Sequence, residues 1–467
     1  MKLNRRNFCK LGAGAAAATA LTPYHFALAQ TEDGFLEIRA RKAEQSLYPD
    51  RPKSAVWTYN GTAPGPEIRV KQGERVKVRF INNLDEPSSI HWHGVRIENA
   101  MDGASGLTQD AVKPGERFEY EFVAPDAGTY WYHAHNRSWN QVGRGLYGPL
   151  IVEEPYSTFD AEHDITLVID DWLLDQNGQF DEGSMGMMMD WSHAGRLGNW
   201  ITVNGKSMPE MDLKAGEAYR LRLINVSNAR TLELDPNRIG AKILAFDGQP
   251  LPEPISMPYA PYLLSSAQRV DLLVIPKEGQ GFALEELSGN APFPFASFSV
   301  TGEANGAVSI PVLKPNALAE PNLDKAKTHR LHITGGAMGR MGNMTYKGKP
   351  LGRQEMMQSM QFWAFNGVAN LPEQQFFTAK RGETVIVEMI NDTAWPHAMH
   401  IHGHHFRIEE REGSNIDEGR PWKDTFLIGP SQTTKIAFVA DNPGKWLLHC
   451  HMLEHAAAGM TTWFEVV

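Results

Sequence analysis

Cysteine is almost absent from this sequence, because Cys9 and Cys450 are the only two among 467 residues. Cys9 lies in an N-terminal stretch with the features of an export signal, so the exported chain would keep Cys450 alone. An internal disulfide is then excluded, although exported proteins commonly pair their cysteines. A single thiol in an oxidising compartment is buried, reactive or bound to a metal, and the histidines beside Cys450 favour a metal.

The sequence also lacks long apolar runs and an excess of positive charge. The apolar run at residues 11–21 is about half of the roughly 20 residues that a membrane span needs, so we expect no stable membrane insertion. The formal charge is −10, and without residues 1–29 it becomes −14, with 41 basic against 55 acidic residues. Such a surface excludes a nucleic-acid-binding patch and favours cationic or neutral substrates.

The first 29 residues have the pattern of a targeting segment. Arg5 and Arg6 precede the apolar run, and the small residues Ala27 and Ala29 stand just before Gln30. A paired arginine ahead of a weakly hydrophobic run predicts a twin-arginine signal peptide over residues 1–29, and therefore a periplasmic protein. An ordinary signal peptide is the alternative.

An internal repeat divides the rest of the chain. A Gly-Glu pair stands eight residues before an Ile-Asn pair, Gly to Ile, in three places: Gly73 and Ile81, Gly216 and Ile224, Gly382 and Ile390. The surrounding sequence alternates as strands do, and Gly (42) and Pro (29) are abundant, so we expect an all-β chain of Greek-key β-sandwich domains. The predicted domains span residues 30–155, 156–318 and 319–467.

The histidines follow this repeat. Residues 9 and 11 after the repeat asparagine are histidines in the first and third copies, and a second pair lies five and seven residues after a turn glycine in each of them. These eight are His91, His93, His133, His135, His400, His402, His449 and His451. The middle copy has Leu234 and Pro236 at positions 9 and 11, so we expect no such pair there.

Four His-x-His pairs in two matched sets indicate one site between two domains. If the first and third domains pack about an approximate twofold axis, eight imidazoles meet in one cavity, which suits about three late first-row metal ions, copper above all. One alternative is that these are ordinary core or surface histidines, which the spacing fixed by the repeat disfavours. Another is that the metal is zinc. Zinc has no obvious use for the Cys, His and Met set that adjoins these pairs.

The C-terminal stretch predicts a second metal site on the same strand. On an extended strand His449 and His451 share one face and Cys450 points to the other, so one strand can serve two centres. A thiolate beside imidazoles, with a thioether further on, is the ligand set of a blue-copper site. Cys450, a later histidine and Met460 supply that set.

Four motifs together resemble the three-domain multicopper oxidases of the bacterial laccase and cuprous oxidase kind. They are His91-Trp92-His93-Gly94, His133-Ala134-His135, His397-Ala398-Met399-His400-Ile401-His402, and the stretch from His449 through His455 to Met460. The resemblance implies three cupredoxin-like domains, with no copper ligands in the middle one, and four coppers per chain. It assigns His397, Cys450, His455 and Met460 to type 1 copper and His91 and His400 to type 2. It assigns His93, His133 and His451 to one type 3 copper, and His135, His402 and His449 to the other.

The implied activity couples one-electron oxidation of a reductant at type 1 copper to four-electron reduction of dioxygen to water, with electrons passing from Cys450 to His449 and His451. The reductant would be a phenolic or aromatic compound, Cu(I), or both, and we expect a monomer. Alternatives are a dedicated periplasmic cuprous oxidase for copper tolerance and a non-catalytic copper-binding scaffold. The complete ligand set disfavours a scaffold, and the third repeat disfavours a two-domain nitrite reductase.

Oxygen reduction needs protons, and Asp102 matches the acid that this family keeps near type 2 copper. The alternative is a turn aspartate before Gly103. Many bacterial relatives carry a second acid directly after the type 1 histidine, but this chain has Ala456 there. The second proton donor therefore stays open, and Glu454, at a helix start and pointing elsewhere, is a weak substitute.

Methionines gather in two windows, residues 185–189 and 338–360, which hold ten of the 19 in the chain: Met185, Met187, Met188, Met189, Met338, Met341, Met344, Met356, Met357 and Met360. Soft thioethers favour contact with Cu(I), and the glycine-rich sequence 335–342 favours a loop. Flexible apolar packing, or a lid, is the alternative. We expect His404 and His405 beside the site or on the surface, and a structural role for Asp392.

Overall fold

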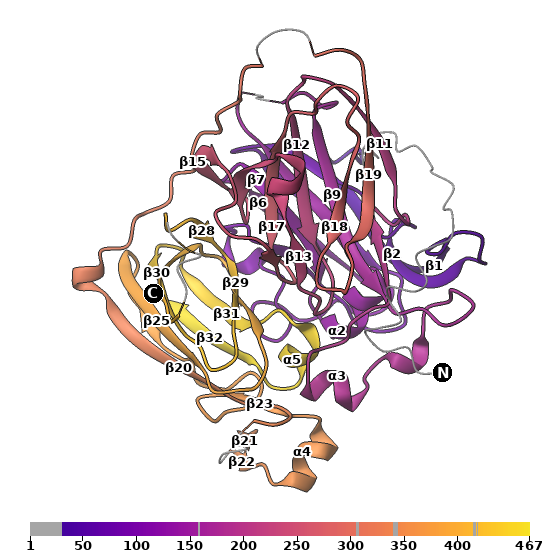
Figure 1. Ribbon diagram of the computed structural model, residues 1–467. Helices are drawn as coiled ribbons and strands as arrows, with labels where there is room; N and C mark the ends of the chain where they lie inside the picture. The colour runs from indigo at the N-terminus through magenta and orange to yellow at the C-terminus, as the bar shows by residue number, and fades with distance from the viewer. Residues whose placement is uncertain (1–29, 157–158, 305–307, 340–343, 414–416, 418) are drawn as a thin grey trace.

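The computed structural model describes residues 30–156, 159–304, 308–339, 344–413, 417 and 419–467. The predicted signal peptide and Met341 lie outside these residues. Strands make up most of the regular structure and the helices are short, so the all-β prediction is confirmed (Figure 1). Among the described residues, none of the helices has the length and apolar character needed to cross a membrane.

The first sheet pair consists of two four-stranded sheets, ordered β2-β1-β4-β6 and β3-β8-β7-β5. Residues Arg75–Asn82 form a strand because buried and more exposed side chains alternate along them. The strands are β1 Leu36–Gln45, β2 Ser54–Tyr59, β3 Ile68–Lys71, β4 Arg75–Asn82, β5 Ile90–His93, β6 Arg117–Val123, β7 Gly128–Ala134 and β8 Tyr147–Glu153.

The middle sheets follow, with orders β10-β9-β12-β17-β14-β15, β11-β19-β18 and β13-β16. Their apolar core is a separate cluster that includes Leu167, Leu221 and Phe298. The strands are β9 Asp164–Trp172, β10 Trp200–Val203, β11 Glu210–Lys214, β12 Tyr219–Asn225, β13 Leu232–Leu234, β14 Lys242–Phe246, β15 Gln249–Ile255, β16 Tyr262–Leu264, β17 Arg269–Val274, β18 Phe282–Glu286 and β19 Phe293–Thr301.

The third sheet pair has the orders β23-β20-β25-β30-β27-β28 and β24-β32-β31-β26-β29, with β21-β22 as a small addition. The strands are β20 Lys327–Gly335, β21 Thr345–Tyr346, β22 Lys349–Pro350, β23 Trp363–Phe365, β24 Thr378–Ala379, β25 Glu383–Asn391, β26 His397–Ile401, β27 Phe406–Arg411, β28 Trp422–Lys423, β29 Thr425–Ile428, β30 Thr433–Ala440, β31 Gly444–Cys450 and β32 Thr461–Val466.

Short helices connect these strands. The α-helices are α2 Ser138–Gln141, α3 Met188–Ser192, α4 Arg353–Ser359 and α5 Leu453–Ala457, and the 3-10 helices are η1 Asn99–Met101, η2 Val142–Arg144, η3 Glu182–Ser184, η4 Pro236–Ile239 and η5 Leu323–Lys325. Helix α5 directly follows β31 and therefore carries the residues after Cys450.

The repeat asparagines explain the internal repeat. Each ends a strand that pairs in parallel with the first strand of its group, at Ala40↔Asn82, Ile169↔Asn225 and Ile333↔Asn391. Each side-chain amide donates to two backbone carbonyls, and each amide oxygen accepts the backbone N–H two residues later. A buried asparagine thus fixes the same loop three times, because its donors and acceptor are all satisfied. The exact domain boundaries remain a prediction.

The first and third sheet pairs share one apolar cluster, which includes Trp92, Tyr132, Trp363 and Phe438. Residues far apart in sequence are therefore packed into a continuous core. The histidine strands β5, β7, β26 and β31 belong to these two sheet pairs, so the shared packing decides where their imidazoles lie.

Candidate metal centres

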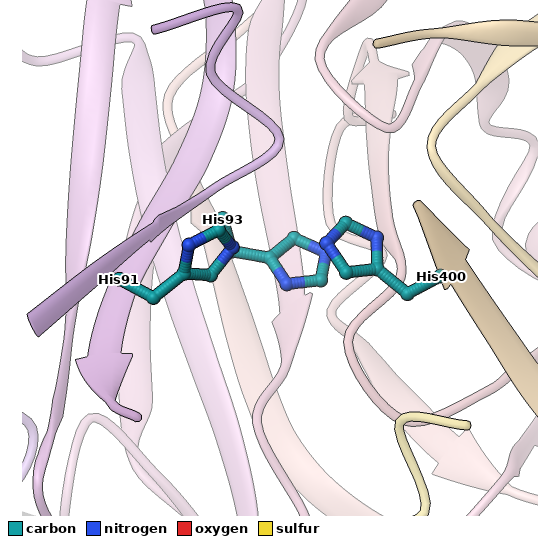
Figure 2. A group of neighbouring side chains, drawn as sticks. All are labelled: His91, His93 and His400. Atoms are coloured by element: carbon teal, nitrogen blue, oxygen red, sulfur yellow. The ribbon is translucent and has the colours of Figure 1, made fainter. Parts of the chain in front are cut away.

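The eight paired histidines meet where the first and third sheet pairs face each other. In the β5 and β7 register His91 lies opposite His133, and in the β26 and β31 register His400 lies opposite His449. Figure 2 shows the rings of His91 and His93 meeting the ring of His400, which comes from the opposite side.

Ring stacking joins the two halves. The ring centroids of His91 and His402 lie 3.8 Å apart, and those of His93 and His400 lie 3.8 Å apart. Each stacked pair takes one ring from β5 and one from β26 or the residue after it. The convergence expected from the repeat spacing is thus present in the structure.

Three groups of imidazoles have their ligand nitrogens within 4.8 Å of one another. They are His91, His93 and His400; His93, His133 and His451; and His135, His402 and His449. The last two equal the two predicted type 3 sets, and the first contains the predicted type 2 pair. That these nitrogens bind copper stays a prediction.

Hydrogen bonds fix which ring nitrogen of His133 and of His449 carries a proton and which keeps a lone pair. The Nδ1 of His133 lies 3.1 Å from Ala134 O, and that of His449 lies 2.8 Å from Cys450 O. These carbonyls accept only from a protonated Nδ1, which leaves Nε2 as a lone-pair donor. The Nδ1 of His402 likewise donates to the Asp102 carboxylate, so its Nε2 is also free. The Nε2 atoms of His402 and His449 lie 3.2 Å apart, and two facing lone pairs favour a cation that binds both.

Unpaired nitrogens provide a further test of the fit to a metal. His91 Nε2, His93 Nδ1 and His400 Nε2 are buried and have no hydrogen-bond partner among the described residues. A buried polar atom is normally satisfied, so three unpaired nitrogens in one group call for a partner that the protein does not supply. A metal ion fits them.

The second site lies on the other face of β31. His397 Nδ1 and His455 Nδ1 are 3.1 Å apart, and Cys450 Sγ lies 3.9 Å from each. The far nitrogens are held in place: His397 Nε2 contacts Thr393 Oγ1, and His455 Nε2 donates to His193 O. Met460 is buried, and its carbonyl accepts the Cys450 N–H. Two nitrogens and a sulfur converge as a soft metal requires.

Burial keeps these groups uncharged before a metal binds. Desolvation lowers the pKa of His449 and of His455 to about 4, and it lowers the pKa of His93, His133 and His400 well below the usual range. The imidazoles are therefore neutral and able to donate lone pairs. Burial raises the pKa of the Cys450 thiol to about 12, so a thiolate there requires a cationic partner.

Asp102 bridges the two halves of the histidine cluster. Its Oδ2 lies 2.9 Å from His402 Nδ1, and its backbone carbonyl lies 2.8 Å from His91 Nδ1. The side chain is fully buried. A carboxylate that accepts from an imidazole orients the ring and increases its basicity, which goes beyond the role of a turn aspartate.

Asp424 makes a matching contact that sequence reasoning missed. Its carbonyl lies 2.9 Å from His400 Nδ1, and its Oδ1 lies 3.2 Å from His93 Nε2. Arg269, from β17 in the middle sheets, donates to both carboxylate oxygens at 2.8 and 2.6 Å. No motif identifies Asp424, because it follows no histidine pair and acts through contacts between three sheet groups.

The remaining predicted residues lie around these sites. Glu454 is buried in α5 and accepts from Asn228 Nδ2 and the Arg196 N–H, so it faces the middle sheets; burial raises its pKa to about 7. His404 and His405 are buried beside the cluster and are not on the surface. Asp392 is exposed and lies 3.4 Å from His332 Nε2.

The methionine windows divide into buried and exposed side chains. Met344 and Met356 are buried, whereas five are exposed: Met187, Met188, Met189, Met338 and Met357. The Ala337 N–H donates to Ser192 O, which joins the segment that carries Met338 to the end of α3. The next residue, His193, contacts His455 through its carbonyl. Exposed thioethers of both windows thus lie on segments that cover the cysteine-containing site.

Known proteins share this architecture. Models of the family described as multicopper oxidase match residues 41–157 and 346–467. A multi-copper oxidase structure from Pseudomonas thermotolerans is 32% identical, with a TM-score of 0.80 over 97% of this chain and 100% of that one. A Campylobacter jejuni multicopper oxidase described as a metallo-oxidase is 25% identical, with a TM-score of 0.79 over 96% and 95%. Laccase-1 of Fomitopsis schrenkii is 29% identical over 87% of this chain and 82% of its own.

Proposed function

From the premise that this chain belongs to the multicopper oxidase family, and is therefore a copper-dependent oxidase with cupredoxin-like domains, we propose that its reductant is Cu(I). Dioxygen is the acceptor. The observation that carries the proposal is the set of exposed methionines on the two segments that cover the site of His397, Cys450 and His455.

The residues that would hold copper are those whose free nitrogens and sulfur converge. His397, Cys450 and His455, with Met460, would hold the mononuclear copper, and the eight paired histidines would hold the other three. Bound copper supplies the one-electron redox steps that couple oxidation of a reductant to reduction of dioxygen to water. Four coppers per chain are the norm of the family.

The chain itself connects the two sites. Cys450 stands between His449 and His451 in sequence, and these two belong to different imidazole groups of the cluster. Cys450 of the mononuclear site is therefore joined to two imidazole groups of the cluster by a few covalent bonds. Asp102 and Asp424 orient the imidazoles, and burial of the cluster excludes bulk water.

Soft thioethers explain the choice of reductant. Several exposed thioethers on neighbouring segments offer soft ligands at the surface, and sulfur ligands select Cu(I) over harder ions. Met187, Met188 and Met189 lie at the start of α3, and His193, just beyond its end, accepts from His455. An ion captured by these thioethers would lie on the segment that contacts the mononuclear site.

The test compares two reductants on one preparation. The triple substitution Met187→Leu, Met189→Leu and Met338→Leu should raise the KM for Cu(I) by about tenfold or more. It should leave the rate with 2,6-dimethoxyphenol almost unchanged. Met208→Leu is the matched control, because Met208 is also exposed and, like Met338, has a positive φ.

Two results decide between the reductants. If the triple variant oxidises Cu(I) with an unchanged KM, the methionines do not capture the metal and the proposal fails. If the parent protein oxidises phenols readily and Cu(I) poorly, the phenolic reductant expected of a laccase is the correct assignment; the likeness to Laccase-1 keeps that candidate in view.

We propose further that the protein is exported to the periplasm by the twin-arginine route and acts as a monomer. The support is the Arg5-Arg6 pair before a weakly hydrophobic run. Replacing both arginines by lysine should retain the protein in the cytoplasm, as shown by fractionation. Size-exclusion chromatography with light scattering measures the oligomeric state.

A further inference from the structure

A cavity of about 460 Å³ lies between the middle and third sheet groups, away from the histidine cluster. Its walls come from β14 to β16 on one side and from β27, β28, β29 and the adjoining loops on the other. The apolar part includes Phe246, Leu251, Met257 and Phe426. This volume and this kind of lining are typical of a site for a small organic molecule.

Thr425 separates the cavity from the metal centres. Gln268 lines the cavity, and its Nε2 donates to Thr425 O at 3.0 Å. The hydroxyl of Thr425 contacts His400 Nδ1 at 3.0 Å on the other side. None of the described residues that line the cavity is a histidine or a cysteine, so this is neither of the candidate copper sites.

Lys423 brings a positive charge into this cavity and has no ion-pair partner among the described residues. The residue is only 6% exposed, and its Nζ lies 4.4 Å from the centre of the Phe246 ring. No described carboxylate forms an ion pair with it. Nearby Asp247 accepts the backbone N–H groups of Arg269 and Thr425 instead. Asp247, Asp417 and Asp424 attract the ammonium, but burial outweighs this attraction and lowers the pKa of Lys423, so an anion in direct contact with Nζ would stabilise the charge.

Arg411, in the same wall of the cavity as Lys423, is a cation that does form an ion pair. Its guanidinium donates to Asp417 at 2.6 Å and also to the carbonyl of Leu427. Arg411 therefore has its counter-charge within the protein. Lys423 forms no ion pair with a described carboxylate: its Nζ lies over the face of Phe246, which attracts a cation but does not neutralise it, and Asp247, Asp417 and Asp424 act on it without direct contact.

Tyr262 adds a second unsatisfied polar group. Its hydroxyl is buried and has no hydrogen-bond partner among the described residues. Its ring lies 5.7 Å from the ring of Phe246, the same ring that Lys423 covers. An ammonium and a phenolic hydroxyl thus stand near one aromatic ring, in a cavity whose lining also includes the charged side chains of Glu253, Arg411 and Asp417.

We propose that this cavity is a binding site for a small aromatic carboxylate. The carboxylate would lie against Lys423 Nζ and accept from the Tyr262 hydroxyl, and the aromatic ring would fill the space beside Phe246 and Met257. The ligand supplies the two partners that the protein lacks and buries its apolar part. The occupant is therefore an organic acid and not a metal ion or a peptide.

The experiment titrates the copper-loaded protein with 2-naphthoate, followed by calorimetry. This probe carries the required acid and ring, and it has no phenolic hydroxyl to be oxidised. Binding should be saturable. Lys423→Met should weaken it by at least about tenfold, because a hydrogen-bonded ion pair is lost, and Tyr262→Phe by about threefold. Lys435→Met is the matched control, because Lys435 is on the same sheet but exposed and paired with Glu410.

A neutral probe and a stability measurement keep the test independent of misfolding. 2-Naphthalenemethanol should bind the parent protein more weakly than 2-naphthoate and should be insensitive to Lys423→Met. Removal of an unpaired buried ammonium should also raise the thermal unfolding midpoint of Lys423→Met. Unchanged blue absorption would show that the copper sites are intact.

Three outcomes would overturn the assignment. One is the absence of saturable 2-naphthoate binding, and another is equal affinity of the parent and Lys423→Met. The third is displacement of 2-naphthoate by inorganic phosphate at equal concentration, which would mean that the cavity holds any small anion and does not select an aromatic acid.

Discussion

The first and third sheet pairs carry the same histidine framework, but only the third adds a thiol. His91 lies opposite His133 in one register, and His400 lies opposite His449 in the other. On the neighbouring rung the first pair has Ile90 opposite Ala134, where the third has Met399 opposite Cys450. The third pair has additional edge strands, but the order β3-β8-β7-β5 matches β24-β32-β31-β26 around the histidines, so at the site the two halves differ in side chains and not in strand order.

Four positions carry this difference. Six residues after the repeat asparagine, the first copy has Ser88 and the third has His397. Counted from the second histidine pair, the first copy has Ala134, Trp139 and Arg144, where the third has Cys450, His455 and Met460. In the first copy, Ser88 donates to Gln141 and Trp139 packs against the apolar core. Each of the two sheet pairs thus provides half of the histidine cluster, and only the third also provides the site of His397, Cys450 and His455.

The two aspartates of the cluster show a second difference. Asp102 and Asp424 each accept from a histidine of their own sheet pair through the carbonyl and contact one of the opposite pair through the carboxylate. Asp424 is also clamped by Arg269, whereas no described arginine or lysine pairs with Asp102. We infer that Asp424 mainly holds the three sheet groups together, and that Asp102 mainly orients His402.

Replacing Cys450 with alanine gives the third sheet pair the residue that the first has at this position, Ala134. We expect the largest effect from this change. The mononuclear site loses its only sulfur anion, so the blue absorption and substrate oxidation should both disappear. Copper analysis should still find about three ions per chain, because the histidine cluster keeps its ligands.

The reciprocal substitution Ala134→Cys serves as the control. It should leave activity intact and create no second blue site, because Ser88 and Trp139 provide no imidazole there. A Cys450→Ala protein that stays blue and active would contradict the assignment.

Asp424→Asn should have the next largest effect, on stability. Arg269 is fully buried, and loss of its charged partner should cost about 3 kcal/mol in the free energy of unfolding. Asp247, 3.7 Å from Arg269, offers partial compensation. Chemical denaturation measures the change, and the double variant with Arg269→Met should recover part of it. A single variant as stable as the parent would show that the clamp is not needed.

Asp102→Asn should have a smaller effect on stability and a selective one on catalysis. The amide keeps the shape but binds the imidazole of His402 less strongly, so turnover of dioxygen should fall about 10- to 100-fold. Oxygen consumption at saturating reductant measures this, with blue absorption as the control for the mononuclear site. Equal turnover in parent and variant would leave Asp102 without the proposed role.

Asn225→Ala tests the repeat in the middle sheets, which supply none of the predicted copper ligands, and should have the smallest effect on the copper chemistry. Two carbonyls lose their donor, which should cost about 1 to 3 kcal/mol without changing copper per chain. Asn391→Ala removes the same contacts beside Thr393, which holds His397, so it should also lower the copper content. Identical copper loss in both variants would refute a local effect.

The pattern of the sequence was informative where the chemistry is local. The spacing from Asn82 and Asn391 predicted which histidines form pairs, and strand alternation predicted that Cys450 faces away from His449, because side chains alternate with a period of two. The convergence of the histidine pairs on one site was expected from the repeat.

Contacts between distant segments were not predicted from the pattern. Asp424 and Arg269 lie 155 residues apart, and neither is close in sequence to a histidine that it positions. The sequence also did not decide whether His404 and His405 lie beside the site or on the surface, and only the packing shows that they are buried. The cavity of Lys423 and Tyr262 belongs to two sheet groups and has no motif.

The sequence alone determined the ligand types and their spacing, because a metal site needs particular donor atoms and a strand repeats every second residue. The tertiary structure decided which nitrogens are free, which carboxylate orients which ring, and where the buried Lys423 stands without a direct ion pair to a described carboxylate. These depend on how three sheet groups pack together, and that packing follows from the shared apolar core and not from any one segment.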